Sequence, residues 1–288
     1  MNSENRYSAV GLVGIFGVSG NVFLLVIKLF VGIMCQSQAL IADAINSAGD
    51  IFASLMTCIG NKISSKPVDS THNFGHGKAE YIFSMFISLS MIGVALKLIY
   101  DAVISFVAND IVFFSWYSII VCAITILIKF LLYKYASVIS KKHNSILVEA
   151  NRRDHLNDMV VTTFTLFAMI CNHLGIFWID KIVACGIAVY ILITGLSMFA
   201  QSSNVLMDKA VDTKTRTLLQ DDIVKKEWVK RIDEFYSKPV GDKFYLVITV
   251  SVDGNMTTFE SHRLADELEK ELNLNETVYK TTVHINPV

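Results

Sequence analysis

Long runs of residues without a formal charge are the feature that most constrains what this chain can fold into. Asp, Glu, Lys and Arg are absent from residues 7–27, 81–96, 111–128, 159–179 and 182–207. A helix needs about 20 mostly apolar residues to cross the hydrocarbon core of a bilayer. A sixth segment, 38–62, is apolar but is interrupted by Asp43, Asn46 and Asp50. We therefore expect a polytopic α-helical membrane protein, with six transmembrane helices at 8–34, 38–63, 79–107, 111–140, 145–173 and 178–206.

The composition agrees with a membrane protein and excludes several other classes. Hydrophobic residues make up 53% of the 288 residues and charged residues only 18%, whereas a soluble domain carries about 25% charge. The net charge of -1 leaves no basic surface for a nucleic acid. The five cysteines all lie in apolar segments without a CxxC pair, so we expect small buried side chains and no disulfide scaffold.

Lysine and arginine in the short connections predict the orientation of the helices. The connection after the second expected helix holds Lys62, Lys66 and Lys78, and basic residues also cluster around the connection after the fourth. The short connection at 35–37 has no basic residue. We expect a multi-pass protein of the cell (inner or plasma) membrane, with both termini in the cytoplasm.

The composition changes at about residue 210. Residues 244–252 alternate between apolar and more polar side chains, as in a half-buried strand. We expect helices at 218–226 and 259–272 and further strands at 229–236 and 278–285. This αββαβ order indicates a small cytoplasmic α+β domain of residues 208–288 after a transmembrane domain of residues 1–207.

Polar residues within the expected membrane helices are the most informative feature. Asn46 and Asp50 are four residues apart, and so are Asp154 and Asp158. Side chains at i and i+4 share one helix face, so two facing helices can present four oxygen donors around one point. Carboxylates there would take up protons or bind a cation. The alternative is that some of them lie in water at the helix ends.

Two neighbours of this quartet have open roles. Asp43 lies about one helical turn before Asn46. It is either a ligand at the mouth of the site or a solvated carboxylate near the membrane boundary, and we favour the second interpretation. His155 follows Asp154 and is rotated by about 100° around the helix axis. Gating or proton relay is therefore the less favoured interpretation of His155.

A second candidate site lies between the second and third expected helices. Asp69, His72 and His76 fall within eight residues, and a carboxylate with two imidazoles suits a cation such as Zn²⁺. In a polar loop this pattern also arises by chance.

With these residues assembled, the chain resembles the cation diffusion facilitators, a family of proton-coupled exporters of divalent metals. The most specific match is His72–Glu80, preceded by Asp69, and residues 41–54 and 154–158 match the ligand segments of the family. The resemblance implies a ferredoxin-like cytoplasmic domain and a homodimer that alternates between inward-facing and outward-facing states. It also implies a transport site made by four residues, namely Asn46, Asp50, Asp154 and Asp158.

The resemblance extends to three further predictions. Lys78 and Asp208 would pair and interlock the membrane and cytoplasmic parts. Asp69, His72 and His76 would form the loop metal site. His262 and His284 are the remaining candidate ligands in the cytoplasmic domain, where surface or core histidines are the alternative.

The donor set predicts the transported metal. Zinc-exporting members of the family usually have a histidine in the quartet, whereas here every donor is an oxygen and one is a neutral amide. Carboxylate and carbonyl donors favour harder ions such as Mn²⁺, and the resemblance implies that Asn at position 46 accompanies manganese selectivity. We therefore expect Mn²⁺ efflux with protons as the counter-ion, and Zn²⁺ or Fe²⁺ as alternatives.

Two other classes of protein, a hydrolase and a metal sensor, fit the sequence less well. An intramembrane metal-dependent hydrolase that uses His72 and His76 is disfavoured because the chain has no HExxH helix. A membrane metal sensor would need an output module larger than the C-terminal domain. We expect a transporter in a lipid bilayer and no enzymatic activity.

Overall fold

The computed structural model describes residues 3–34, 38–108, 116–173, 178–241 and 243–288. The chain divides into two compact units. The first consists of Met1–Lys66 and Ala79–Ser203, and the second of Pro67–Lys78 and Asn204–Val288. The loop with the Asp69 pattern thus groups with the C-terminal unit, and the domain boundary expected at 207/208 stays a prediction.

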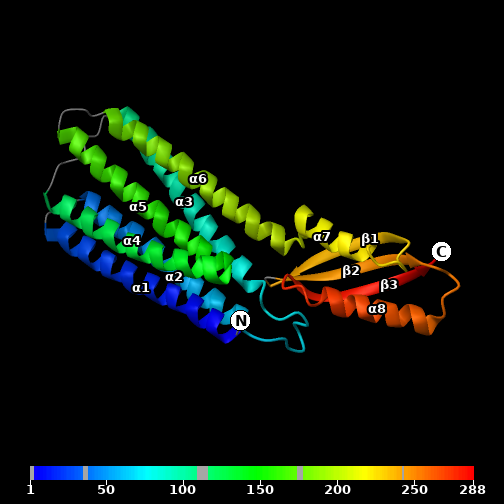
Figure 1. Ribbon diagram of the computed structural model, residues 1–288. Coiled ribbons are helices and arrows are strands. Elements are labelled where there is room, and N and C mark those ends of the chain that lie inside the picture. The colour runs from blue at the N-terminus through cyan, green and yellow to red at the C-terminus, as the bar shows by residue number, and fades with distance from the viewer. Residues whose placement is uncertain (1–2, 35–37, 109–115, 174–177, 242) are drawn as a thin grey trace. The chain divides into compact units, whose positions relative to one another are not determined.

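In the described part of the chain, six long helices account for most of the N-terminal region, as can be followed in Figure 1. They are α1 (Ser3–Met34), α2 (Gln38–Ser64), α3 (Ala79–Ala108), α4 (Trp116–His143), α5 (Ile146–His173) and α6 (Trp178–Leu206). Among the described residues, α1, α3, α4 and α6 each contain a segment long and apolar enough to cross a membrane. Helices α2 and α5 are less apolar because they carry the predicted metal ligands. The predicted class of a helical membrane domain followed by an α+β domain is confirmed.

The helices pack through apolar and small side chains. Helix α1 packs along α2 and α4, and α2 also packs against α3 and α5. A Cβ atom added to Gly14 of α1 would lie 2.5 Å from Cys58 Sγ and 3.0 Å from the backbone nitrogen of the same cysteine. Small residues thus let α1 and α2 approach closely, as is typical of membrane helices.

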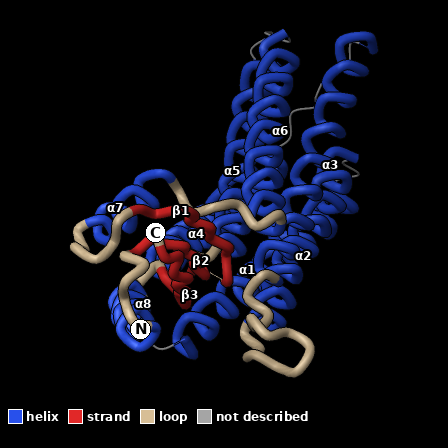
Figure 2. Tube along the Cα trace, turned by 90° about the vertical axis from the view of Figure 1, so that its right-hand side faces the viewer, coloured by secondary structure: helices blue, strands red, loops and turns tan. Residues whose placement is uncertain are grey.

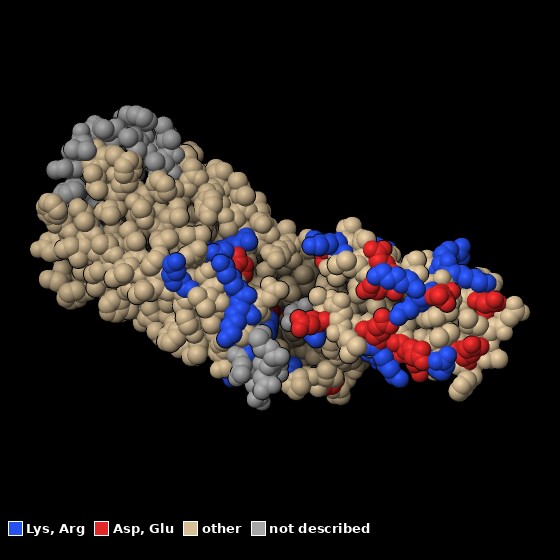
Figure 3. Space-filling view, viewed as in Figure 1, with Lys and Arg blue, Asp and Glu red and all other residues tan. Residues whose placement is uncertain are grey.

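The outer surface of the helices is apolar. Large hydrophobic side chains such as Phe16, Phe23 and Phe30 of α1 are exposed. In the view of Figure 3 most of the surface of the helices has no charged side chain, whereas charges of both signs crowd the surface of the C-terminal unit. The first surface suits hydrocarbon and the second suits water.

The C-terminal unit is a three-stranded sheet with two helices (Figure 2). Its elements are α7 (Thr213–Val224), β1 (Arg231–Val240), β2 (Lys243–Val252), α8 (Thr258–Leu272) and β3 (Val278–Pro287). The strand order is β1-β2-β3. Strand β2 pairs antiparallel with β1, with Ile248 opposite Phe235, and parallel with β3, with Ile248 opposite Val283. The predicted αββαβ order is confirmed.

One face of this sheet carries the core of the unit. Leu246, Ile248 and Val250 of β2 form one buried cluster with Leu219 of α7 and Leu268 of α8. Side chains alternate between the two faces of a strand, so Thr249 and Ser251 lie on the opposite face.

Candidate metal centres

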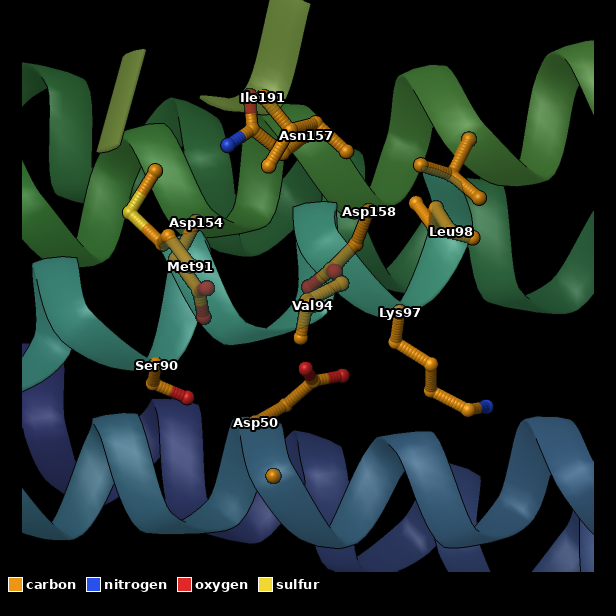
Figure 4. A pocket seen from close by; sticks show the side chains of 12 residues that line it. Asp50, Ser90, Met91, Val94, Lys97, Leu98, Asp154, Asn157, Asp158 and Ile191 are labelled. Atoms are coloured by element: carbon orange, nitrogen blue, oxygen red, sulfur yellow. The ribbon is translucent and has the colours of Figure 1, made fainter. Parts of the chain in front are cut away.

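Three carboxylates from α2 and α5 meet inside the helical unit. Asp50 of α2 and Asp154 of α5 are 8% and 9% exposed, and the side chain of Asp158 is 17% exposed. All three line one cavity of about 170 Å³, together with Asn157 of α5 and residues of α3 and α6. Figure 4 shows Asp50 extending from α2 towards Asp158, with Asp154 beside it on α5. The spacing of four residues thus places Asp154 and Asp158 on one face, as predicted from helix geometry.

The fourth member of the predicted quartet is Asn46. Asn46 belongs to α2, but its side chain lies outside the part of the chain that the structure describes, and so does that of Asp43. The structure therefore brings three of the four predicted transport residues together.

A buried lysine that the sequence analysis overlooked lies against these carboxylates. Lys129 of α4 is 1% exposed. Its Nζ donates to Asp50 Oδ2 at 2.7 Å and to Asp158 Oδ2 at 2.5 Å. One ammonium therefore links α2, α4 and α5. A signal existed in the sequence, because Lys129 ends the uncharged run 111–128 and lies well inside the expected 111–140 span, where charges are functional candidates by default.

A second buried lysine lies close by. Lys28 of α1 is 3% exposed and donates to Ser47 Oγ of α2 at 3.1 Å. It lines a small cavity of about 20 Å³ together with Asp50, Lys129 and Asp158.

Helix α5 adds two polar side chains to the carboxylates. His155 is 1% exposed, and one ligand atom from each of Asp154, His155 and Asp158 lies within 4.8 Å of the others. Adjacent positions differ by about 100° around a helix, yet the imidazole lies near both carboxylates, although neither ring nitrogen has a hydrogen-bond partner among the described protein atoms. Asn157 is 4% exposed, and both atoms of its amide lack a hydrogen-bond partner among the described protein atoms. The sequence analysis did not include Asn157, although its position three residues after Asp154 places it near the same face of the helix.

The loop residues Asp69, His72 and His76 also converge. His72 Nδ1 lies 3.2 Å from Asp69 Oδ1, and His76 Nε2 lies 3.5 Å from Asp69 Oδ2. His76 Nδ1 lies 3.3 Å from the carbonyl oxygen of Pro67, an arrangement that fixes the ring and leaves Nε2 directed at the carboxylate. One carboxylate oxygen and two imidazole nitrogens are donors suited to Zn²⁺ or another borderline divalent ion.

Hydrogen bonds hold the Asp69 carboxylate as an anion. The Thr71 hydroxyl donates to Asp69 Oδ1 at 2.8 Å, and the backbone nitrogens of Thr71 and His72 donate to the same oxygen. These bonds, the Thr71 hydroxyl foremost, hold the pKa of Asp69 well below its usual range. The carboxylate is therefore ready to accept a cation at any physiological pH.

The remaining predicted residues belong to the C-terminal unit. Lys78 Nζ donates to Asp208 Oδ1 at 2.5 Å. His262 lies on α8, where its side chain is 78% exposed and its Nε2 is 3.9 Å from Asp266 Oδ1. His284 is exposed on β3 opposite Thr249, on the face away from the core. The structure therefore does not bring His262 and His284 together within one chain.

Sequence profiles match nearly the whole chain. The cation efflux transmembrane domain matches residues 14–207, and the cytoplasmic domain of cation efflux proteins matches residues 212–288.

Individual proteins are similar over most of their length. The manganese efflux system protein MneP of Bacillus subtilis is 31% identical over 284 residues, which cover 96% of this chain and 95% of that protein. The manganese efflux system protein MneS of the same organism is 28% identical, with 94% and 93% covered. The magnetosome protein MamM of Paramagnetospirillum magneticum is 28% identical, with 89% and 81% covered.

Proposed function

Because the chain belongs to the cation efflux family of metal transporters, we propose that it exports Mn²⁺ from the cytoplasm in exchange for protons. Members of this family are transporters rather than enzymes, so the hydrolase alternative is rejected. The protein is a multi-pass membrane protein. Our proposal further places it in the plasma membrane as a homodimer with both termini in the cytoplasm, as the distribution of Lys and Arg indicates.

The observation that carries the proposal is the shared cavity of Asp50, Asp154 and Asp158. Carboxylates buried among apolar helices are costly unless a cation neutralises them. Oxygen donors favour harder divalent ions such as Mn²⁺. The similarity to two manganese efflux proteins supports the same ion.

The exchange follows from the chemistry of these ligands. A carboxylate must be deprotonated to bind a metal, so metal binding and proton binding exclude each other. Mn²⁺ would bind from the cytoplasm, and after the site opens outwards, protons would displace it from the carboxylates. Return of the protonated site to the cytoplasmic side completes the cycle.

Zn²⁺ or Fe²⁺ is the alternative transported ion, and the position of His155 beside the carboxylates of α5 favours it. The imidazole lies near these carboxylates, and imidazole is a ligand suited to Zn²⁺ and Fe²⁺. If His155 is a ligand, His155→Ala weakens Zn²⁺ transport more than Mn²⁺ transport. Conversely, Asn46→His shifts the preference towards Zn²⁺ if position 46 sets the selectivity.

Transport by reconstituted vesicles tests the proposal. We expect vesicles with an acidic lumen to take up Mn²⁺, and collapse of the pH gradient to slow the uptake. Asp50→Ala abolishes this uptake, whereas Asp101→Ala, which removes an exposed carboxylate of α3, serves as the matched control. Mn²⁺ uptake at the same rate with and without a pH gradient contradicts proton exchange. Near-normal uptake by Asp50→Ala contradicts the assignment of Asp50 to the transport site.

Two parts of the proposal concern the C-terminal unit. Asp69, His72 and His76 would hold a second divalent ion, for which their geometry and charge are suited. The Lys78–Asp208 ion pair would act as the interlock between the membrane and cytoplasmic parts. Metal content of purified His76→Ala protein tests the first, and transport by Asp208→Ala tests the second.

A further inference from the structure

Lys129 binds one oxygen of each of two carboxylates, Asp50 and Asp158, that the proposed transport site assigns to the metal. Its ammonium contacts Asp50 Oδ2 at 2.7 Å and Asp158 Oδ2 at 2.5 Å. The side chain is 1% exposed, so water does not replace these contacts. One carboxylate oxygen from each of α2 and α5 is therefore bound to a cation that belongs to the chain itself.

Burial of this lysine requires its anionic partners. An ammonium has three donors and no acceptor, and an unpaired charge in a membrane helix is expensive. The carboxylates have the same need, because removal of one partner from a buried ion pair leaves the other uncompensated. Lys129 and the two carboxylates thus stabilise one another as long as no metal is bound.

A divalent ion in the same place disturbs this arrangement. Two cations that share carboxylate ligands repel each other strongly in a buried, poorly screened site. Metal–oxygen contacts are also shorter than ammonium–oxygen contacts, so both cannot use the same oxygen atoms in the same geometry. Metal binding therefore requires the ammonium to move away.

The structure provides a space on the ammonium's side of the site. The cavity of about 170 Å³ is lined by Asp50, Asp154 and Asp158. The cavity of about 20 Å³ lies on the other side of Asp50 and Asp158, which line it as well. Its remaining lining consists of Lys28, Lys129, Val161 and two threonines, Thr125 of α4 and Thr162 of α5. A cavity of that size holds about one water-sized group, and threonine hydroxyl oxygens can accept hydrogen bonds from an ammonium.

We propose that Lys129 is the resident counter-cation of the transport site and competes with the metal for Asp50 and Asp158. This inference rests on the proposed transport function. The incoming metal displaces the charged ammonium into the smaller cavity, and the ammonium returns to the carboxylates when the metal leaves. Lys28, which lines the same smaller cavity, repels the displaced ammonium and so favours its return. Lys129 thereby weakens metal binding and promotes release.

Metal affinity of the purified full-length protein in detergent micelles tests this role. We expect Lys129→Met and Lys129→Gln to bind Mn²⁺ at least about tenfold more tightly than wild type at one fixed pH, measured by titration calorimetry. The matched control is Lys134→Met, because Lys134 is an exposed lysine of the same helix. Equal or weaker binding by the Lys129 variants overturns the proposal. If Lys129→Met does not fold, Lys129→Gln alone decides.

Transport kinetics separate competition from a merely structural role. With the competitor removed, both KM and kcat for Mn²⁺ should fall, because the metal binds tightly and leaves slowly. Lys129→Arg keeps the positive charge and should keep weak binding. Tight binding by Lys129→Arg, or a fall in kcat with unchanged KM in Lys129→Met, overturns the proposal.

The two proposals fail in different ways. If the wild-type protein neither binds nor transports Mn²⁺ or another divalent ion, the transport function fails and this inference falls with it. If wild type and Lys134→Met bind and transport the metal while Lys129→Met has unchanged affinity, only the role of Lys129 is wrong.

Discussion

Two isosteric substitutions on α5 should separate the stability of the protein from metal binding. Asp158 Oδ2 accepts a hydrogen bond from Lys129 Nζ at 2.5 Å. Asp154 Oδ2 is buried and has no hydrogen-bond partner among the described protein atoms. Asp158→Asn therefore replaces one of the two anionic acceptors of the Lys129 ammonium by a neutral amide. Asp154→Asn instead removes a carboxylate whose buried Oδ2 has no donor among the described protein atoms.

The magnitudes follow from these contacts. A hydrogen bond to a charged group contributes about 1.5–3 kcal/mol and a neutral one about 1 kcal/mol, so Asp158→Asn should lower the free energy of unfolding by about 0.5–2 kcal/mol. Asp154→Asn should leave that free energy unchanged or raise it. Mn²⁺ at about 100 times its Kd stabilises the wild type by about 2.7 kcal/mol, and 100-fold weaker binding leaves only about 0.4 kcal/mol. Both variants should lose this stabilisation, since each lacks an anionic ligand.

Thermal unfolding of the purified protein in detergent micelles, followed by tryptophan fluorescence with and without Mn²⁺, measures both effects. We expect Asp158→Asn to unfold at a lower temperature than Asp154→Asn without metal, and neither variant to gain stability from Mn²⁺. The reasoning is refuted if Asp154→Asn is the less stable variant, or if it keeps the full stabilisation by Mn²⁺.

Three further predictions concern other parts of the chain. Gly14→Val should lower the unfolding temperature in micelles because its Cβ meets a backbone nitrogen of α2 at 3.0 Å, whereas Gly93→Val, with no atom within 4 Å, should not. Gly77→Val should speed proteolysis of the 67–78 loop, since its Cβ would lie 2.9 Å from Gly241 Cα; unchanged cleavage would contradict that contact. Asp233 has a pKa lowered to about 2, chiefly by the Ser251 hydroxyl, so it contributes stability above about pH 4 that is lost as the pH falls towards 2. Asp233→Asn should therefore reduce the change in amide hydrogen-exchange protection of the sheet between pH 4 and pH 2, and an unaltered profile would refute this.

Local sequence signals determined most of the fold. Five runs without charge and one interrupted apolar segment predicted six helices, because a chain in hydrocarbon must satisfy its backbone within each segment. The predicted boundaries differ where a local contact extends an element. Helix α7 was expected from residue 218 but begins at Thr213, because the side chain of Asp212 accepts a hydrogen bond from the backbone nitrogen of Thr215 at 3.0 Å. Strand β1 was expected to end at 236 but continues to Val240, because it pairs with β2 along its whole length.

The sequence by itself also placed Asp154 and Asp158 on one helix face, since the spacing of four residues is a property of a single helix. Only the tertiary structure decided that Lys129 of α4 lies against Asp50 and Asp158. Helix periodicity determines which residues of one helix share a face, but the contacts between helices depend on how their side chains pack. The same limit applies to the burial of His155, which is 1% exposed because the surrounding helices cover α5. The counter-charge of this site was therefore visible in the sequence as a lysine within an apolar span, but its partners were decided by the packing of three helices.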